Sequence, residues 1–385
     1  MGKSIGYRLF ALLYQLCRLL PVKKKRVFCI MTHDDGEGSN VSLAVKALQE
    51  QGAGYTFSYL RKKDKAAGKG LGSITGFLSF YLGKPYQLSR AEIILLDNIF
   101  LPMAYLKRRK GVKVIQLWHG TGTIKKFGQH VNTGRLKELE KKANSNITHL
   151  IVNSEETRKL YAEVFGIGED RVYPIGLPKT DELIQRLKEA ERLGVYRDKE
   201  AIYQKYSIPK QAKLLLYAPT LRDRDLQATT ILDQLKGLQE GLPEHYYLGL
   251  RLHPYIAEAS KEVKLLPRVC QMSFESDLNS LLMASDVLIT DYSSIIFEYC
   301  LTGRPMIFFA YDLQEFSDRG RGFYWDYETY VPGPVTATAE ETVEVLREHV
   351  FDPARIRSFR DRNYSHLDGK ARERLIELIM TKETE

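Results

Sequence analysis

The sequence predicts an α/β protein with two doubly wound domains, each a parallel sheet covered by helices on both faces. Three observations predict this fold. Short apolar runs alternate with amphipathic stretches, the pattern restarts in the second half after a charged region, and 44% of the 385 residues are hydrophobic, enough for two cores. Gly and Pro are near their average abundance, so we expect an ordered chain nearly throughout.

The first half contains five runs typical of buried strands, separated by stretches with helical periodicity. They cover residues 26–32, 54–60, 91–96, 112–118 and 149–153. Residues 179–212 are rich in Lys, Arg and Glu at helical spacing, and we place the domain boundary in this region. We therefore predict an N-terminal domain over residues 26–205.

The second half repeats this architecture. Its predicted strands cover residues 214–218, 246–252, 269–274, 287–290 and 305–310, with helices at 278–284 and 294–301. These elements predict a C-terminal domain over residues 206–352. The closing segment, residues 353–385, is predicted to be helical and to pack back toward the N-terminal domain.

Residues 1–25 are predicted to form a basic amphipathic helix that associates with a membrane. Apolar side chains recur at helical spacing from Ile5 to Leu19. A cationic cluster follows, made of Lys23, Lys24, Lys25 and Arg26. The apolar run of about 12 residues is too short to span a bilayer, whereas each cation near anionic lipid gains on the order of 1 kcal/mol.

Three alternatives compete for this N-terminal segment: a helix packed on the body of the protein, a nucleic-acid-binding arm and a secretory signal. Arg18 and the lack of a small-residue cleavage site weaken the signal interpretation.

The cysteines and motifs exclude several function classes. Cys17, Cys29, Cys270 and Cys300 lie far apart without zinc-finger spacing, so we expect reduced thiols in a cytosolic compartment. The sequence contains no P-loop, no G-x-G-x-x-G and no G-x-S-x-G motif. The acidic residues near the candidate sites form no evident metal cage, so we predict neither a metal nor a cofactor.

The first polar cluster follows the strand at residues 112–118. A histidine at a strand end has a pKa near 6.5, so His119 can accept a proton from an attacking hydroxyl at neutral pH. A structural histidine in a glycine turn is the alternative. The residues predicted to serve the acceptor side are Gly120, Thr121, Lys125 and Lys126, with Asp34 and Asp35 from the acidic loop after the first strand, for which no binding role is the alternative.

Further polar clusters close the strands of the second half. Arg251 and His253 share one face of a strand end, which aims a cation and an imidazole at one spot. A structural ion pair for Arg251 is the alternative. Arg222 suits bidentate phosphate contact, and a salt bridge to Asp223 or Asp225 is its alternative.

The segment from Thr290 to Ser294 leads from a strand into a helix. Free N–H groups and a positive dipole end at a helix start attract phosphate, and N-capping by Ser294 is compatible with that role. Glu298 is predicted to hold a ribose or glycerol hydroxyl. The residues predicted to bind a donor are Pro219, Thr220, Arg222, Arg251, Thr290, Asp291, Ser293, Ser294 and Glu298.

Taken together, these strings resemble the CDP-glycerol glycerophosphotransferase family of wall teichoic acid synthesis. The matching segments, in chain order, are residues 117–121 (LWHGT), 173–181 (YPIGLPKTD), 216–223 (LYAPTLRD), 252–255 (LHPY), 290–294 (TDYSS), 304–312, 321–324 and 332–334. Their order makes the match specific over residues 26–380. One departure is Leu221, where many relatives have Trp.

The resemblance implies a GT-B fold, with the donor nucleotide in the second domain and the acceptor approached from the first. It also implies peripheral attachment to the cytoplasmic face of the plasma membrane. Length and N-terminal layout are similar to those of the primases, which add the first glycerol phosphate to an undecaprenyl-diphosphate-linked ManNAc-GlcNAc disaccharide. Long polymerising members carry an extra N-terminal region that we do not find here.

The resemblance further implies a mechanism. His119 would deprotonate a sugar hydroxyl of the acceptor, which attacks the glycerol-bearing phosphorus of CDP-glycerol and expels CMP. His253, Arg222, Ser293 and Ser294 would stabilise charge on the diphosphate. Other wall teichoic acid enzymes are possible partners, and nucleic acid is not an expected one.

Two alternatives to this function stay open. Relatives that transfer ribitol phosphate share most of the motifs, so transfer of ribitol phosphate, or of several glycerol phosphates, is the alternative within enzymes. A non-catalytic protein that binds RNA or anionic lipid, suggested by the net charge of +9, is the alternative outside them.

Overall fold

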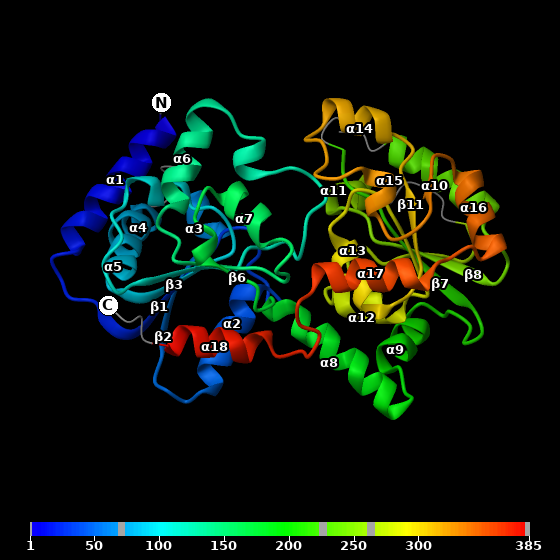
Figure 1. Ribbon diagram of the computed structural model, residues 1–385, viewed down its shortest axis with the longest axis horizontal. Coiled ribbons are helices and arrows are strands. Elements are labelled where there is room, and N and C mark those ends of the chain that lie inside the picture. The colour runs from blue at the N-terminus through cyan, green and yellow to red at the C-terminus, as the bar shows by residue number, and fades with distance from the viewer. Residues whose placement is uncertain (1, 68–73, 223–228, 260–265, 382–385) are drawn as a thin grey trace. The chain divides into compact units, whose positions relative to one another are not determined.

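Each half of the chain builds one sheet of six parallel strands with helices packed on it (Figure 1). The computed structural model describes residues 2–67, 74–222, 229–259 and 266–381. The first unit comprises Met1–Thr121, Phe127–Asp181 and Tyr364–Glu385, and the second comprises Gly122–Lys126 and Glu182–Asn363. The short segment Gly122–Lys126 therefore belongs to the second unit although it lies in the first half of the sequence.

The first sheet has the order β2-β1-β3-β4-β5-β6, with all neighbouring strands parallel. Its strands are β1 (Lys23–Met31), β2 (Thr56–Arg61), β3 (Ala91–Leu96), β4 (Lys113–Gln116), β5 (His149–Ile151) and β6 (Val172–Tyr173). β2 pairs on one side of β1 and β3 on the other, so the chain reverses its direction of travel across the sheet at β1. Such a reversal opens a crevice beyond the carboxyl ends of β1 and β3, where ligands of α/β proteins commonly bind.

Helices cover the first sheet on both faces. They are α1 (Gly2–Cys17), α2 (Asn40–Glu50), α3 (Lys62–Ala67), α4 (Ile74–Leu78), α5 (Lys84–Ser89), α6 (Gly134–Asn144), α7 (Arg158–Phe165) and α18 (Ala371–Met380), with a π-helical turn η1 (Ser79–Gly83) and 3₁₀ turns η2 (Leu101–Tyr105), η3 (Gly128–His130) and η4 (Glu169–Arg171). α2 and α18 bury apolar side chains against one face of β1, β3 and β4. Helix α18 thus brings the end of the chain back onto the first unit.

Helix α1 is packed on one side and open on the other. Phe10, Ala11 and Tyr14 are buried, and the Phe10 ring lies 5.6 Å from that of Phe80 in η1. The apolar stripe predicted from the helical spacing instead faces solvent, with Leu12 and Leu16 each 58% exposed. None of the described helices is long and apolar enough to cross a membrane.

The second sheet has the order β12-β11-β10-β7-β8-β9, again with parallel neighbours. Its strands are β7 (Lys213–Ala218), β8 (Tyr246–Leu250), β9 (Val269–Gln271), β10 (Val287–Thr290), β11 (Met306–Phe309) and β12 (Val335–Thr336). Here the chain reverses its direction across the sheet at β7, because β8 lies on one side and β10 on the other. A second crevice is expected beyond the carboxyl ends of β7 and β10.

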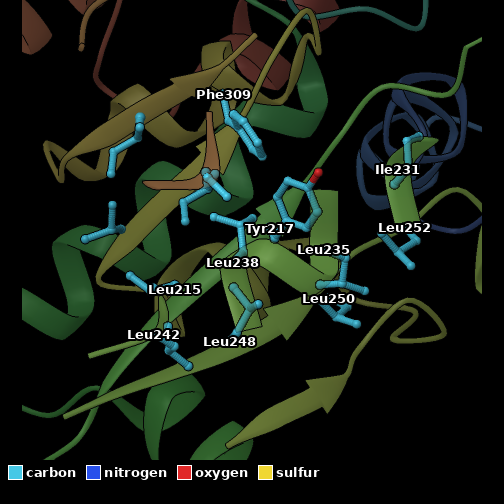
Figure 2. Close-up of a cluster of buried hydrophobic side chains, with 14 of the residues drawn as sticks. Leu215, Tyr217, Ile231, Leu235, Leu238, Leu242, Leu248, Leu250, Leu252 and Phe309 are labelled. Carbon is cyan, nitrogen blue, oxygen red and sulfur yellow. The ribbon is translucent and has the colours of Figure 1, made fainter. Parts of the chain in front are cut away.

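The second sheet also carries helices and a continuous core. The helices are α8 (Pro178–Leu193), which begins in the first unit, α9 (Arg197–Lys205), α10 (Thr229–Gly241), α11 (Pro254–Ala259), α12 (Leu278–Ala284), α13 (Ile295–Tyr299), the 3₁₀ turn η6 (Cys300–Thr302), α14 (Leu313–Arg319), α15 (Tyr327–Tyr330), α16 (Ala339–Glu348) and α17 (Pro353–Asn363). Figure 2 shows Leu235 and Leu238 of α10 packed on Tyr217 and Leu248 of the sheet. Each fully buried apolar side chain of this size stabilises the fold by about 1.5–3 kcal/mol.

The ten predicted strands all have counterparts in the two sheets, whereas the two-residue strands β6 and β12 were not predicted. The first unit ends at Asp181 rather than at residue 205, and α17 belongs to the second unit, so only residues from Tyr364 onward return to the first. Helix α1 ends at Cys17 and Lys23–Lys25 open strand β1, so the cationic cluster lies on a strand and not on the predicted helix of residues 1–25.

Candidate active site

Asp97 organises the crevice of the first sheet. It follows β3, is almost fully buried, and its carboxylate accepts the main-chain N–H groups of Thr32, His33 and Asp34 at 2.8–2.9 Å. The main-chain oxygen of Asp97 lies 3.0 Å from Nδ1 of His119. One buried residue therefore fixes both the loop after β1 and the imidazole after β4.

The contact with Asp97 sets the tautomer of His119. A carbonyl oxygen only accepts hydrogen bonds, so Nδ1 carries the proton and Nε2 keeps its lone pair. The rings of His33 and His119 stack with centroids 3.6 Å apart and an interplanar angle of 10°. Burial first, and then the nearby His33, lower the pKa of His119 to about 4. Its ring is therefore neutral at physiological pH, as a proton acceptor must be.

The turn that presents His119 is held in an unusual backbone conformation. Trp118 has φ +55°, a region that non-glycine residues seldom adopt. Its N–H donates to Oε1 of Gln116 at 3.0 Å, and its carbonyl accepts from Nδ2 of the buried Asn40 at 3.1 Å. Asn40 Oδ1 also accepts the N–H of Lys179 at 3.0 Å. These contacts stabilise the one turn conformation that places His119 beside Asp97.

The residues immediately after His119 pass into the second unit. Thr121 is buried and its carbonyl accepts from Nδ2 of Asn153 at 2.8 Å in the first unit. In the second unit, the N–H of Lys126 donates to Gly322 at 3.0 Å, and Lys125 forms an antiparallel bridge with Phe323. A Cβ on Gly122 would lie 2.5 Å from the ring of Phe297, so only glycine fits at that point.

A pocket of about 350 Å³ opens in the crevice of the second sheet. Strand ends β7, β8, β9 and β10 all contribute to it, as the reversal at β7 predicts. The residues that line it are Lys125, Pro219, Thr220, Leu221, Arg251, Leu252, His253, Ser273, Ser293 and Ser294. Six residues predicted to bind the donor or to take part in catalysis therefore line one pocket. They are Pro219, Thr220, Arg251, His253, Ser293 and Ser294. Lys125, which was predicted on the acceptor side, also lines it.

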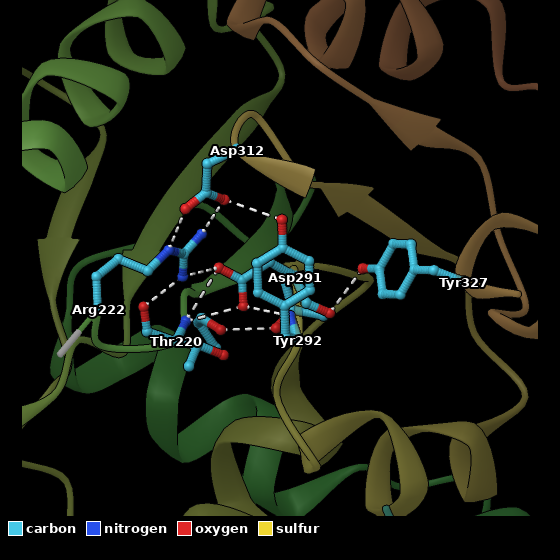
Figure 3. Close-up of polar contacts among 8 residues, drawn as sticks. Thr220, Arg222, Asp291, Tyr292, Asp312 and Tyr327 are labelled. Carbon is cyan, nitrogen blue, oxygen red and sulfur yellow. Dashed lines mark hydrogen bonds and ion pairs between the residues drawn. The ribbon is translucent and has the colours of Figure 1, made fainter. Parts of the chain in front are cut away.

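Arg222 is not among the residues that line this pocket, and its side chain lies in a network of polar contacts that includes Thr220 of the lining (Figure 3). Its guanidinium makes two parallel bonds to Asp312, Nε–Oδ2 at 2.7 Å and Nη2–Oδ1 at 2.8 Å, and Nη1 lies 2.7 Å from Asp291 Oδ2. Burial opposes its charge, but the two carboxylates outweigh that effect and raise its pKa. The side chain predicted to contact phosphate is thus engaged in a buried ion-pair network in this structure. Asp223 and Asp225, its predicted alternative partners, lie outside the described residues.

Asp291 links that network to the pocket. Its carboxylate accepts the N–H groups of Thr220 at 2.9 Å and Tyr292 at 2.5 Å, and its carbonyl accepts the hydroxyl of Tyr327 at 2.9 Å. The Thr220 hydroxyl oxygen is buried and has no hydrogen-bond partner among the described residues. Because a buried hydroxyl without a partner is costly, Thr220 is well suited to meet a ligand in the pocket.

Several predicted donor residues have hydrogen-bond partners within the protein. Arg251 donates through Nη1 to the carbonyls of Ser273 and Glu275 at 2.8 and 2.7 Å, and Thr290 donates to Ala218 at 2.7 Å. Glu298 is buried in α13 and does not line the pocket. Ser294 makes no capping bond at α13, and Ser293 Oγ accepts the Ile295 N–H at 3.4 Å.

The remaining predicted residues lie at the surface. Asp34 and Asp35 are exposed, Asp34 Oδ1 accepts the N–H of Gly36 at 3.0 Å, and Gly120 is half-buried. Lys23, Lys24 and Lys25 are exposed as well. Within the described part of the chain, no group of three or more His, Cys, Asp or Glu side chains is arranged to hold a metal ion.

Comparison with known proteins identifies the family. The family described as CDP-Glycerol:Poly(glycerophosphate) glycerophosphotransferase matches residues 12–381. The chain belongs to this family. It is therefore a member of the teichoic acid polyol-phosphate transferases, among which relatives are named for glycerol phosphate and for ribitol phosphate.

Three curated relatives illustrate this range. The chain is 31% identical to a teichoic acid ribitol-phosphate primase of Bacillus spizizenii, over 94% of this chain and 93% of the relative. It is 32% identical to a teichoic acid glycerol-phosphate primase of Bacillus subtilis, over 76% and 74%. It is also 32% identical to a poly(ribitol-phosphate) polymerase of Bacillus spizizenii, covering 100% of this chain but only 60% of the relative.

Solved structures show the same fold. The wall teichoic acid polymerase TagF, as a histidine variant soaked with CDPG, matches with a TM-score of 0.77 at 24% identity, over 97% of this chain and 93% of that chain. A UDP-GlcNAc 2-epimerase from Neisseria meningitidis matches with a TM-score of 0.60 at 11% identity, over 92% and 99%. The predicted GT-B fold is confirmed by the match to TagF and by the two parallel six-stranded sheets.

Sequence reasoning missed the residues that position the imidazole. Asp97 is a single carboxylate after a buried strand, and Asn40 is a single amide at the start of α2. The available signal was position: Asp97 directly follows β3, one of the two strands that border the first crevice. His33, in the loop after β1, was likewise not predicted as a site residue.

Proposed function

We propose that this protein transfers glycerol phosphate from CDP-glycerol to a sugar hydroxyl of a disaccharide carried on undecaprenyl diphosphate, and releases CMP. The family membership supports polyol-phosphate transfer, and the soak of TagF with CDPG supports CDP-glycerol as the donor. The observation that carries the chemistry is the neutral His119, whose Nδ1 is occupied by Asp97 and whose Nε2 is left as a base.

The proposed reaction follows from these groups. The acceptor hydroxyl gives its proton to Nε2 of His119, and its oxygen forms a bond to the glycerol-bearing phosphorus. The bond from that phosphorus to the CMP oxygen breaks, and CMP leaves with the electron pair. In a phosphoryl transfer of this kind, the protein contributes mainly by positioning the reactants and by stabilising the charge on the phosphates.

The pocket of the second sheet is the proposed donor site. Lys125 and His253 supply positive charge or hydrogen-bond donors, and the hydroxyls of Thr220, Ser293 and Ser294 supply further donors. The contribution of Arg222 is indirect, because its network with Asp291 fixes the backbone of Thr220. The reaction is proposed to need no metal or cofactor, and titration of activity with EDTA tests this.

The exposed face of α1 is the proposed membrane contact. Apolar side chains from Ile5 to Leu19 line it, and Leu19 is 88% exposed. Lys23–Lys25 follow at the start of β1, where their exposed side chains favour anionic headgroups. We place the protein at the cytoplasmic face of the plasma membrane, where the lipid-linked acceptor and other wall teichoic acid enzymes would be found.

A donor comparison tests the proposed function. Purified protein is incubated with a short-chain disaccharide-diphosphate lipid and either CDP-glycerol or CDP-ribitol, and the product is weighed by mass spectrometry. The proposal predicts a mass increase of one glycerol phosphate with CDP-glycerol and little product with CDP-ribitol. A preference for CDP-ribitol would establish the related ribitol-phosphate transfer instead, and several added units would indicate a polymerase.

A further inference from the structure

A pocket of about 400 Å³ lies along strand β2, the edge strand of the first sheet, and the proposed reaction uses none of its residues. Strand β2, helix α3 and helix α5 form its walls. Its lining includes Tyr59, Arg61, Lys63, Asp64, Lys84 and Gln87. Three cations and one carboxylate therefore surround a single space at the edge of the sheet.

The carboxylate of Asp64 is engaged within the pocket wall. Its Oδ2 accepts the main-chain N–H of Arg61 at 2.8 Å and lies 3.2 Å from Nζ of Lys84. Lys84 Nζ also donates to the carbonyl of Tyr59 at 2.6 Å. Asp64 thus balances one of the three cations, and the charges of Arg61 and Lys63 exceed the acidic charge of the lining.

Arg61 is arranged as an anion-binding group. Its guanidinium lies over the ring of Tyr59, 4.8 Å from the centroid, which restricts its orientation. Its Nε is buried and meets no hydrogen-bond acceptor among the described residues. A buried N–H without an acceptor costs free energy, and a planar guanidinium is the side chain best matched to a phosphate.

The segment that supplies Lys84 and Gln87 to the pocket also carries exposed apolar side chains. Tyr86 lies between Lys84 and Gln87 on α5, and just before α5 Leu82 in η1 is 52% exposed. Phe77 and Leu78 of α4 are exposed as well. Helix α1 lies beside α5 and η1 (Figure 1) and has an exposed apolar stripe of its own. Exposed apolar clusters of this kind mark binding surfaces, here on the elements that lead into the pocket wall.

We propose that this pocket binds the phosphates of a lipid phosphate, whose apolar chain lies over the exposed side chains of α4, η1 and α1. Cations alone would suit any soluble phosphate, but the exposed apolar side chains favour an amphiphile. The inference rests on the proposed function only for the identity of that lipid, which would be the polyprenyl diphosphate that carries the acceptor sugar.

Equilibrium binding of farnesyl diphosphate, a water-soluble isoprenoid diphosphate, tests the proposal without any donor nucleotide. The wild-type protein is expected to bind farnesyl diphosphate more tightly than inorganic pyrophosphate or farnesol. Arg61→Gln and Lys63→Gln are each expected to weaken binding about fivefold, the effect of about 1 kcal/mol per cation near a lipid phosphate. Leu82→Ser is expected to weaken binding of farnesyl diphosphate but not of pyrophosphate.

Lys46→Gln is the matched control, because Lys46 is an exposed lysine of the same unit on α2. It should bind farnesyl diphosphate like the wild type, and all variants should show the wild-type melting temperature. Unchanged binding in both Arg61→Gln and Lys63→Gln would overturn the proposal, and so would equal affinity for pyrophosphate and farnesyl diphosphate. Failure of CDP-glycerol turnover would count against the proposed function alone, since this assay contains no donor.

Discussion

The stacked histidines should control the pH dependence of catalysis. Burial is the largest cause of the lowered pKa of His119, and a charge on His33 lowers it further, as Lys179 does, while the Asp97 carbonyl and Asp34 raise it. His33→Phe keeps a ring in the stack but removes the titrating group. The pKa of His119 should then rise from about 4 toward its ordinary value, and the acid limb of kcat/KM should move to higher pH.

This shift is measured from kcat/KM between about pH 4 and pH 8. Asp35→Asn, an exposed carboxylate two residues after His33, is the control and should leave the limb nearly in place. A merely structural role for His33 would lower activity at every pH by one factor. If the acid limb of the kcat/KM profile stays in place in His33→Phe, His33 does not lower the pKa of His119.

The Arg222 network should be important for stability. Asp312→Asn removes the carboxylate that makes two bonds to Arg222 and one to the Tyr292 hydroxyl. Asp291 still balances the charge of Arg222, but a charge-assisted bond is lost, so we expect a loss of about 1.5–3 kcal/mol in the free energy of unfolding. Urea denaturation measures it. Glu344→Gln, which removes an exposed pair with Arg347, should change it by less than about 1 kcal/mol.

At the scale of elements, hydrogen bonds from Lys113 connect the last helix, α18, to the first sheet. It is a buried lysine at the start of β4, and its Nζ donates to the carbonyls of Leu378, Ile379 and Thr381 at the end of α18, at 2.5–2.9 Å. A cation at a helix C-terminus satisfies carbonyls that have no helical partner and opposes the negative end of the dipole.

Lys113→Met should keep the length and packing of the side chain but leave those carbonyls without a donor. We expect a loss of about 2 kcal/mol in unfolding free energy and faster hydrogen exchange over residues 371–380. Lys141→Met, an exposed lysine of α6, provides the comparison. If hydrogen exchange in α18 is as slow in Lys113→Met as in the wild type, apolar packing alone holds the helix on the sheet.

Strands were predictable from sequence because they are buried on both faces and read as apolar runs, as 91–96 and 287–290 do. The two-residue strands β6 and β12 are too short to produce such a run. The polar network was not predictable, since Arg222 finds Asp291 and Asp312 about 70 and 90 positions later, on two other strand ends. Sequence patterns indicated which strand ends carry polar clusters, but not which cations would already be paired.

At the scale of the molecule, the two sheets follow one plan. In each, the chain reverses its direction across the sheet, and the candidate residues lie beyond the strands that border that reversal: His33 and Asp97 at β1 and β3, Thr220 and Ser293 at β7 and β10. The segment Gly122–Lys126 connects the two sites along the chain. It follows His119 closely in sequence, belongs to the second unit and contributes Lys125 to the pocket there.

Gly122→Ala tests the importance of that link. The added methyl group would meet the Phe297 ring at 2.5 Å, so the segment must shift and carry Lys125 with it. We expect weaker CDP-glycerol binding by isothermal titration, with a folded protein by circular dichroism. Gly38→Ala, where nothing lies near the added Cβ, should bind like the wild type. Equal affinity in the two variants would show that the segment does not position the donor.

The central claim is that His119 is the base for transfer from a donor held by the second unit. The most direct measurement compares His119→Ala with the wild type in two assays, CDP-glycerol binding and CMP release with the lipid acceptor. We predict nearly unchanged donor affinity and a loss of about 10² to 10⁴-fold in turnover, the usual contribution of a general base. Near-normal CMP release from His119→Ala would contradict the claim.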